Sequence, residues 1–283
     1  MITGIDHIGL EVTDFDTTVR NYETIFGVAP NWRGGTSAWK HCWFQFNNMA
    51  LDVVGAQGDS EGANAIRNEI ATFGEGIFGL GFSVPDLEEA TLLLERRGLQ
   101  FREPHTTLSQ DADGRERRWQ IAMMKRASGN GVALFVVQNK PDAERWPSAP
   151  AKFGDASVHA LDHIVVQTTN AERAVALYGG RLGLDLRLDR SNEQWGARQL
   201  FFRAGGGAIV EVGASLKAPV SDAMDKFGGL AWRVKDPEAA RARIAAAGID
   251  VSEVRKGRKP GTSVFTVRSG TGGVPTLMLS GND

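Results

Sequence analysis

The tripeptide Asp6-His7-Ile8 decides the fold, because the chain repeats it as Asp162-His163-Ile164, 156 residues later. Other residues recur at the same offset, which shows that a whole unit is duplicated. These pairs are Thr13 with Thr169, Val19 with Val175, Tyr22 with Tyr178, Gly27 with Gly183, Trp39 with Trp195 and Phe46 with Phe202. A repeat of this kind indicates that one structural unit is used more than once.

A second duplicated unit lies between the copies of the first. The segment 79–84 (Gly-Leu-Gly-Phe-Ser-Val) aligns with the segment 229–234 (Gly-Leu-Ala-Trp-Arg-Val), and Gly98 downstream aligns with Gly248. The chain therefore contains four units. Their approximate boundaries are 4–56, 77–138, 160–214 and 227–281.

Each unit has the pattern of a strand, a helix and three further strands. In the first unit, residues 5–12 alternate between apolar and polar side chains, as in a strand with one buried face. Asp14 or Asp16 is placed to cap a helix over about 16–26, and Gly27 is placed to end it. The strands that follow are expected at 28–33, 40–47 and 49–55, with a turn at Asn47-Asn48.

The composition predicts a two-domain protein with an ordinary hydrophobic core. The 283 residues include 32 Lys and Arg against 34 Asp and Glu, and this balance argues against a nucleic-acid-binding protein. No apolar run reaches the roughly 18 residues of a membrane span, and the N-terminus lacks the features of a secretory signal. The single cysteine, Cys42, is expected to be buried and unpaired. Together these features predict a cytoplasmic protein without nucleic-acid or membrane partners.

The stretch 139–160 contains three prolines and shows no periodicity, so it is expected to link two halves. A shorter connection, 57–76, joins the first two units and is long enough for a helix from Ala63 to Phe73 that could cover a pocket. The predicted organisation is a first domain at 1–140, a linker at 141–159 and a second domain at 160–283.

Four tandem βαβββ units, with Asp-His-Ile in the first strand and an acidic residue in the fourth, resemble the vicinal oxygen chelate superfamily. That superfamily contains glyoxalase I, extradiol dioxygenases, fosfomycin and bleomycin resistance proteins and methylmalonyl-CoA epimerase. The resemblance covers nearly the whole chain and is specific for the superfamily, not for one activity. It implies an α+β fold in which four βαβββ modules form two glyoxalase-like domains with cupped mixed sheets. In the family, the concave face of such a sheet holds a divalent metal that polarises two neighbouring oxygens of a substrate.

The resemblance places the candidate metal ligands in the odd-numbered units. The first-strand ligand falls on His7 and His163, and the fourth-strand ligand falls on Asp52 and Glu211. The matching positions in the even-numbered units carry residues that cannot bind a metal, namely Gly79, Phe135, Gly229 and Met278. The small residues at these first strands, which include Gly81 and Ala231, are expected to leave room for a ligand.

Two pairings of the units are open. Pairing in chain order, which short connections favour, gives each cup one histidine and one carboxylate. Zinc and non-haem iron usually have three protein ligands, and a third from His41 or His105 would not lie at a matched position. Pairing the first unit with the third, within a chain or across a dimer, would instead bring His7, Asp52, His163 and Glu211 into one metal site. His7 and Asp52 could also form a hydrogen-bonded pair without any metal.

Four residues are candidates for substrate binding. Arg118 and Gln120 share one face of a strand in the second unit, opposite the face of Arg117 and Trp119, and one of these pairs could bind an anionic substrate. Trp195 and Arg198 in the third unit are further candidates for a pocket wall. The segment 255–259 (Arg-Lys-Gly-Arg-Lys) could contact a phosphate or a carboxylate, but a solvated charge run needs no function. The spacings define no Ser-His-Asp arrangement.

The first hypothesis is a metal-dependent, glyoxalase-like lyase or isomerase that acts on a small oxygenated organic substrate. A divalent metal ion (Zn, Ni, Co, Mn or Fe) would act as a Lewis acid, with Glu211 or Asp52 as general base. One alternative is an extradiol-type ring-cleaving dioxygenase, which Gly229 and Met278 weaken. Others are a metal-free binding or resistance protein and a structural member whose cups are filled by side chains. A homodimer is expected by analogy with the fold.

Overall fold

The computed structural model describes residues 1–138 and 147–281 and contains the four expected units. The first comprises β1 (Gly4–Glu11), α1 (Phe15–Phe26), β2 (Trp32–Gly35), β3 (Trp39–Gln45) and β4 (Ala50–Ala56). After α2 (Glu61–Phe73), the second comprises β5 (Gly76–Ser83), α3 (Leu87–Arg96), β6 (His105–Gln110), β7 (Glu116–Met123) and β8 (Leu134–Gln138).

A short 3₁₀ turn at Gly154–Ala156 leads into the second half of the chain. The third unit comprises β9 (Ala160–Thr168), α4 (Ala171–Ala174), which continues as a π-helix over Val175–Arg181, β10 (Asp185–Asn192), β11 (Ala197–Arg203) and β12 (Ile209–Ser215). The fourth comprises β13 (Lys226–Arg233), α5 (Pro237–Ala246), β14 (Arg255–Lys256), β15 (Ser263–Val267) and β16 (Thr276–Ser280). Within the described residues, no helix is both long and apolar enough for a membrane span.

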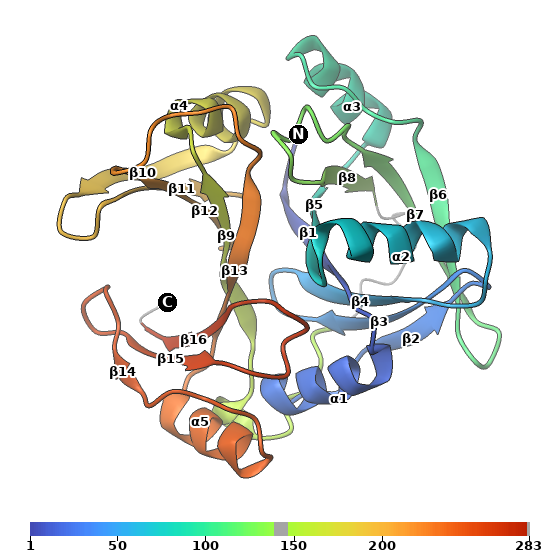
Figure 1. Cartoon of the computed structure of the whole chain (residues 1–283). Helices are drawn as coiled ribbons and strands as arrows, with labels where there is room; N and C mark the ends of the chain where they lie inside the picture. The colour runs from blue at the N-terminus through green and yellow to red at the C-terminus, as the bar shows by residue number, and fades with distance from the viewer. Residues whose placement is uncertain (139–146, 282–283) are drawn as a thin grey trace.

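The units pair in chain order, and each pair forms one eight-stranded mixed sheet. The first sheet has the order β1-β4-β3-β2-β6-β7-β8-β5 and closes into a barrel, because Gly35 of β2 pairs with Gln110 of β6. The second sheet has the order β10-β11-β12-β9-β13-β16-β15-β14 and stays open between β10 and β14. Figure 1 shows the barrel on the right, crossed by α2, and the open curved sheet on the left. The predicted α+β fold of four βαβββ modules is confirmed, except that the first sheet is a barrel, not a cup.

The first unit shows which local predictions hold. The Asp14 side chain accepts a hydrogen bond from the Thr17 backbone N–H at the start of α1, and Gly27 ends the helix with φ +67°. The strand expected at 28–33 is wrong, since β2 begins only at Trp32. Pro30 has no N–H to donate, and Val28 pairs instead with Ala151 of the inter-domain segment.

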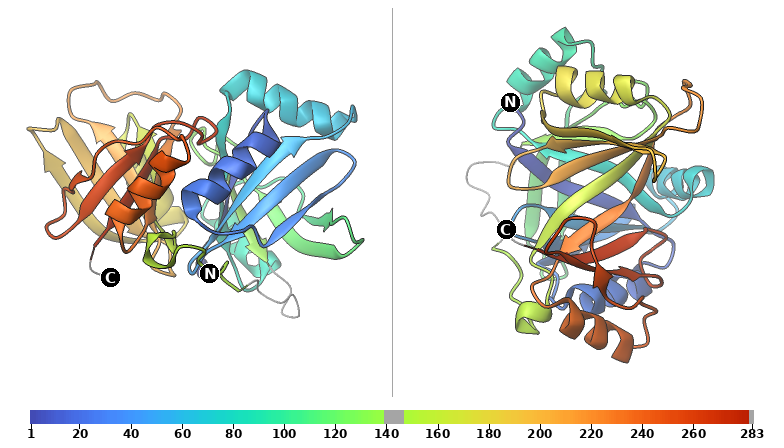
Figure 2. Two further views of the ribbon diagram at one scale, coloured as in Figure 1. Left: turned by 90° about the horizontal axis from the view of Figure 1, so that it is seen from below. Right: turned by 90° about the vertical axis from the view of Figure 1, so that its left-hand side faces the viewer.

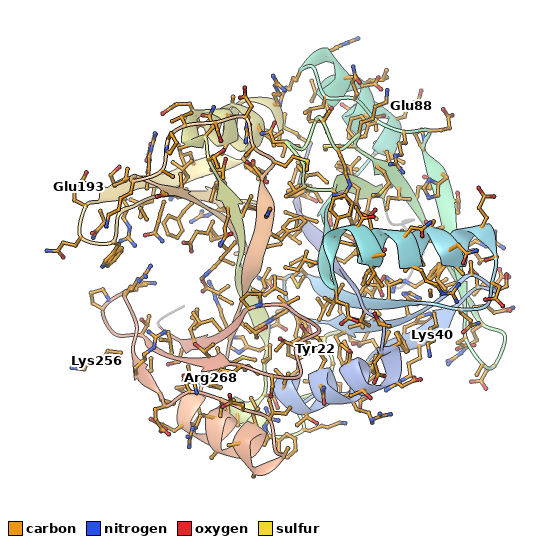
Figure 3. The ribbon with its side chains drawn as sticks, viewed as in Figure 1. Tyr22, Lys40, Glu88, Glu193, Lys256 and Arg268 are labelled. Carbon is orange, nitrogen blue, oxygen red and sulfur yellow. The ribbon has the colours of Figure 1, made fainter. Side chains whose placement is uncertain are left out.

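The two halves share one hydrophobic core, formed by the convex side of the open sheet and the first barrel. The Phe26 ring lies 4.8 Å from the Trp232 ring, measured between centroids. Tyr22, labelled in Figure 3 on α1, donates a buried hydrogen bond of 2.9 Å to the Thr271 carbonyl oxygen. Because the core occupies the convex side, the concave face of the second sheet points away from the barrel.

Candidate functional site

The four candidate metal ligands lie in two separate sheets. β1 pairs with β4 and β5, which places His7 and Asp52 inside the first barrel. β9 pairs with β12 and β13, which places His163 and Glu211 in the second sheet. A single site made of all four side chains is therefore wrong. The units pair with their neighbours in the chain, as short connections favour.

Side chains fill the interior of the first barrel. The His7 ring lies between Trp43 and Phe135, at centroid distances of 4.9 and 5.0 Å. A Cβ atom on Gly79 or Gly81 would come within 2.8 or 2.2 Å of the Phe135 ring. The room that these glycines were expected to leave for a ligand is taken by Phe135.

Asp52 belongs to a buried chain of hydrogen bonds in the barrel wall. Its Oδ1 lies 2.7 Å from Nδ1 of His41, and Nε2 of His41 lies 2.7 Å from Oγ of Ser109. The Trp32 indole N–H donates to the same Oγ atom at 2.9 Å. The spacings did not predict this Ser-His-Asp chain, because its members come from three different strands. His41 lies on β3 and is fully buried.

The Ser-His-Asp chain has the connectivity of a nucleophile and its base, but it lacks space for a substrate. Ser109 and His41 are both 0% exposed. A Cβ atom on the neighbouring Gly34 would come within 2.6 Å of the Ser109 hydroxyl oxygen, so the wall is tightly packed at this point. The chain ties β2, β3, β4 and β6 together beside the strand pair that closes the barrel. We therefore assign it a structural role.

The choice of Arg118 and Gln120 as residues of the cup is wrong. Arg117 lies over the Trp43 ring, with its guanidinium carbon 4.0 Å from the centroid, and Trp119 packs with Phe135 in the barrel interior. Arg118 points outward on the other face of β7 and forms an exposed ion pair with Glu116 at 2.7 Å. Period-two alternation had paired the residues correctly but could not show which face is inside. Burial of Arg117 lowers its pKa, and Asp52 and Asp6 partly oppose that shift.

The second sheet encloses an open cavity of about 860 Å³ on its concave face. Figure 2 shows the sheet curving around this side. The floor carries His163 from β9, Glu211 from β12 and Gln199 from β11, and the walls contain apolar residues such as Val165, Phe201, Leu277 and Leu279. The cavity therefore combines apolar walls with a polar floor, and charged side chains such as Arg190 and Arg258 line it as well. Apolar walls with a few convergent polar groups are typical of a small-molecule site.

His163 and Glu211 meet on this floor. Nε2 of His163 lies 3.4 Å from Oε2 of Glu211, and Nδ1 of His163 lies 2.8 Å from Oδ1 of Asp162. Asp162 also accepts a 2.8 Å hydrogen bond from Nε of Arg233. Burial raises the pKa of Asp162, but the hydrogen bonds and charges of His163 and Arg233 outweigh burial and hold it below its usual range. The ionised Asp162 thus orients the His163 ring, with Nε2 turned towards Glu211.

Gln199 is a residue of this site that the sequence analysis missed. Its side-chain N–H donates to Oε1 of Glu211 at 2.6 Å, and its oxygen accepts from Arg190 at 3.0 Å. Trp43 pairs with Asp52 between β3 and β4, and Phe201 pairs with Glu211 between β11 and β12. Trp43 and Phe201 therefore occupy matching positions. Two residues before each of them stand His41 and Gln199, which correspond to one another. The same strand pairing matches Phe202 with Phe44 and not with Phe46. The sequence offset between the two copies of the unit therefore changes by two residues in this hairpin. A shift of two keeps each side chain on its face.

Met278 was aligned with the fourth-strand ligand position, but its side chain lies on the side of the sheet that faces away from the cavity. It is fully buried in the shared core, whereas its neighbours Leu277 and Leu279 line the cavity. Slipping the alignment by one residue moves a side chain to the opposite face of a sheet. The residue that faces the cavity beside Ala231 is Leu277. This position too carries no metal-binding group.

Neither of the two candidates in the third unit lines the cavity, but Trp195 contacts two residues that do. It lies at the turn between β10 and β11, with the guanidinium carbons of Arg258 and Arg190 at 4.4 and 5.3 Å from its ring centroid. Arg198 projects from the convex side and binds Asp189 and Glu172, at 2.7 and 2.6 Å. Those hydrogen bonds raise the pKa of Arg198. The pair with Glu172 links β11 to α4 on the side of the sheet that faces away from the cavity.

The donor set fits a resident divalent metal poorly. Each half supplies one histidine and one carboxylate at the expected positions, and the described part of the chain has no cluster of three His, Cys, Asp or Glu placed to hold a metal. Zinc and non-haem iron sites usually contain three protein ligands. In the barrel, the Asp52 carboxylate is hydrogen-bonded to His41. In the open sheet, the Glu211 carboxylate accepts a hydrogen bond from Gln199. We therefore derive no chemical step through a metal.

Family comparisons agree with the two-sheet architecture. Residues 5–160 match the family described as "Glyoxalase-like domain", and residues 162–266 match the "Glyoxalase/Bleomycin resistance protein/Dioxygenase superfamily". The chain belongs to this glyoxalase superfamily, also called the vicinal oxygen chelate superfamily. A search of curated proteins found no significant sequence match.

Solved structures share the glyoxalase fold over almost the whole chain. One is a mutant 4-hydroxymandelate synthase from Streptomyces coelicolor, with a TM-score of 0.71 and 15% identity, covering 99% of this chain and 93% of its own. Another is the Mn(II)-bound glyoxalase from Novosphingobium aromaticivorans, with a TM-score of 0.64 and 15% identity, covering 99% and 82%. At such identities the likeness shows the fold alone. Both are enzymes of the superfamily, and the second holds a divalent metal in its own site.

Proposed function

We propose that this glyoxalase-superfamily chain is an enzyme that moves a proton within a small oxygenated organic substrate, as an isomerase or lyase does. The reaction would take place in the second cup. The observation that supports this most strongly is the contact of 3.4 Å between His163 and Glu211 on the floor of a cavity of about 860 Å³. An imidazole and a carboxylate are the side chains used most often for proton transfer near neutral pH.

The contacts around this pair suggest a role for each residue. Gln199 holds one oxygen of Glu211 and leaves the other directed towards His163, so Glu211 is suited to remove a proton from a carbon beside a carbonyl group. His163, as the imidazolium ion held by Asp162, would give its Nε2 proton to the carbonyl oxygen. The step yields an enol. When the substrate is a hydroxyketone, this enol is an enediol with a second hydroxyl on the carbon that lost its proton. That second hydroxyl gives its proton to His163, and the Glu211 proton is delivered to the former carbonyl carbon, which completes an isomerisation and restores both side chains.

Asp52 is no longer a candidate base, because its carboxylate is engaged with His41 inside the wall of the barrel. Ring cleavage of the extradiol type is not favoured either, because its iron usually needs two histidines and one carboxylate. The second cup supplies one of each in the expected positions. The proposal therefore rests on proton transfer by His163 and Glu211.

A specific observation supports a second candidate, a metal-free binding protein. The cup is wide and open, and its two-ligand set would be sufficient to orient a bound compound without converting it. Such a protein would retain affinity for its ligand and show no exchange of substrate protons. The enzyme and the binding protein therefore differ in whether they exchange carbon-bound protons of the ligand with solvent.

The test is solvent deuterium exchange. The protein is incubated in D₂O with a panel of 2-oxo acids, 2-hydroxy acids and hydroxyketones, and carbon-bound deuterium is followed by NMR. His163→Gln and Glu211→Gln are expected to lower the exchange rate by about 10²–10⁴-fold, the usual contribution of acid–base catalysis. The same changes in the first half, His7→Gln and Asp52→Asn, are the matched controls, after their folding has been checked by circular dichroism.

Equal loss of exchange in the first-half controls would contradict the placement of the reaction in the second cup. Compounds that bind without exchange, in wild type and variants alike, would favour the binding protein. Exchange that depends on His163 and Glu211 alone supports the enzyme.

A further inference from the structure

One side of the second cup is strongly basic. Six basic side chains line the cavity against two carboxylates, Asp162 and Glu211. Arg255, Arg258 and Lys259 come from β14 and the loop that follows it in the fourth unit. The remaining three are Arg190 of β10 and Arg233 and Lys235 at the end of β13.

Among the described residues, the three side chains from the fourth-unit loop differ from Arg233 and Lys235 in having no ion-pair partner. Arg233 is bound to Asp162 at 2.8 Å, and Lys235 lies 3.7 Å from Asp155. Across the described residues, no carboxylate forms an ion pair with Arg255, Arg258 or Lys259. A surface charge run would be solvated on all sides, but these three residues line the cavity, and Lys256 between them does not. Arg255, Arg258 and Lys259 therefore border the cup at its exposed rim.

A contact across the open side adds to this arrangement. Arg258 lies over the Trp195 ring at 4.4 Å from its centroid, although the two residues come from opposite edges of the sheet. Figure 3 labels Glu193 in the turn between β10 and β11 and Lys256 on β14, at the opposite edge of the same sheet. Stacking on a ring fixes a guanidinium plane and leaves its N–H donors free for a planar or tetrahedral oxyanion.

We infer that the second cup recognises its substrate through a doubly charged oxyanion, a phosphate ester or a dicarboxylate, bound between Arg255, Arg258 and Lys259 beneath Trp195. The apolar wall, which includes Phe201 and Leu277, then contacts the carbon skeleton. The opposite end of the molecule reaches His163 and Glu211. Only the assignment of that reacting end rests on the proposed function, because the oxyanion site stands on its own side chains.

The test is isothermal titration calorimetry of the full-length protein at fixed ionic strength. The two probes are inorganic pyrophosphate and malonate, which represent the phosphate and the dicarboxylate. Saturable binding of at least one probe with a stoichiometry of one is expected. Arg258→Gln and Arg255→Gln should each raise its Kd by about tenfold, as expected for the loss of a charge-assisted hydrogen bond. Lys256→Gln, which removes the same charge from the same segment outside the cavity, is the matched control.

The outcomes separate the two proposals. Binding that is weakened by the cavity arginines and unchanged by Lys256→Gln supports the oxyanion site, and the tighter probe identifies its chemical class. Absence of binding by both probes would overturn the inference, as would equal weakening by Lys256→Gln, which indicates diffuse attraction. Glu211→Gln should still bind the probe, so a failure of the proton-transfer proposal would leave this result intact.

Discussion

The two halves of the chain keep the same histidine and the same acidic position but use them differently. In the first half, His7 is packed between aromatic rings and Asp52 is bound to His41 in a closed barrel. In the second half, His163 and Glu211 lie at the bottom of an open cavity. The difference comes from the residues around them and not from the pair itself. Of the two duplicated halves, one is stabilised by the side chains that fill its barrel, and the other has an open cavity that can hold a ligand.

Two matched positions explain the contrast. The residue that approaches the acid from the neighbouring strand is His41 in the first half and Gln199 in the second. The residue facing the cup from the last strand is Phe135 in the first half and Leu277 in the second. A phenyl ring at the glycine-lined position fills the barrel, while the smaller leucine leaves the second cup open. Exchanges at such positions should therefore have unequal effects on the two halves.

The largest effect on stability is expected for Phe135→Ala. Phe135 is 1% exposed, and removal of such a ring usually lowers the free energy of unfolding by about 3–5 kcal/mol, including the cost of the cavity. Leu277→Ala at the matched position should cost well under half as much, because Leu277 already borders an open cavity. Urea denaturation measures both. Equal losses would show that the second cup is as well packed as the barrel.

A pH-dependent effect is expected for Glu11→Gln. Burial raises the pKa of Glu11 to about 7, an effect that Arg126 partly opposes, whereas the matched Gln167 is neutral and exposed. The folded state therefore holds the proton more tightly than the unfolded state, and the carboxyl lowers stability as pH rises from 4.5 to about 7. Glu11→Gln should stabilise the protein by about 3 kcal/mol at pH 8 and have little effect at pH 4.

Thermal unfolding of wild type and Glu11→Gln across this pH range provides the measurement. Gln167→Glu is the reverse exchange in the second half, and its effect should be small because that side chain is exposed. A stabilisation by Glu11→Gln that does not depend on pH would contradict the explanation by proton binding.

A smaller loss is expected for Ser109→Ala. This change leaves Nε2 of His41 and the indole N–H of Trp32 without their buried partner and should lower the free energy of unfolding by about 1–3 kcal/mol. Gln199→Ala, which removes the corresponding partner of Glu211, should cost less stability because water can reach the cup. Chemical denaturation distinguishes the two, and an unaffected Ser109→Ala variant would rule out a stabilising role for the buried chain.

The smallest effect is expected for Arg118→Ala. Its ion pair with Glu116 is exposed, and such pairs usually contribute about 0–1 kcal/mol. The variant should also leave probe binding in the second cup unchanged in calorimetry. A clear loss of binding would restore Arg118 as a ligand contact.

Two duplications, that of Asp6-His7-Ile8 and that of the segment 79–84, were enough to predict the four units, because strand and helix periods recur within each copy. The Asp14 cap and the helix before the second unit were also readable, since they depend on local hydrogen bonds and turn chemistry. The closure of the first barrel was not, because it depends on one contact between β2 and β6 and on the Phe135 ring. Neither could alternation alone decide that Arg117 faces inward and Arg118 outward.

The candidate site was predicted in part. The resemblance identified His163 and Glu211, which the structure brings together, and it also identified His7 and Asp52, which the structure keeps apart from them. Gln199 carried no signal, since a single glutamine on a strand is ordinary. The basic segment 255–259 was predicted as a possible anion contact, but its position at the rim of the cup depends on tertiary packing. The homodimer and the cytoplasmic location remain predictions.

The contrast between a closed and an open half is tested most directly by the reactivity of the histidines. Brief treatment of the native protein with diethyl pyrocarbonate, followed by peptide mass mapping, compares His163 with His7 and His41 in one sample. Their side chains are 17%, 5% and 0% exposed. The account predicts that His163 is modified while His7 and His41 stay unmodified until the protein unfolds. Modification of His7 as fast as His163 would contradict it and would reopen the first half as a functional site.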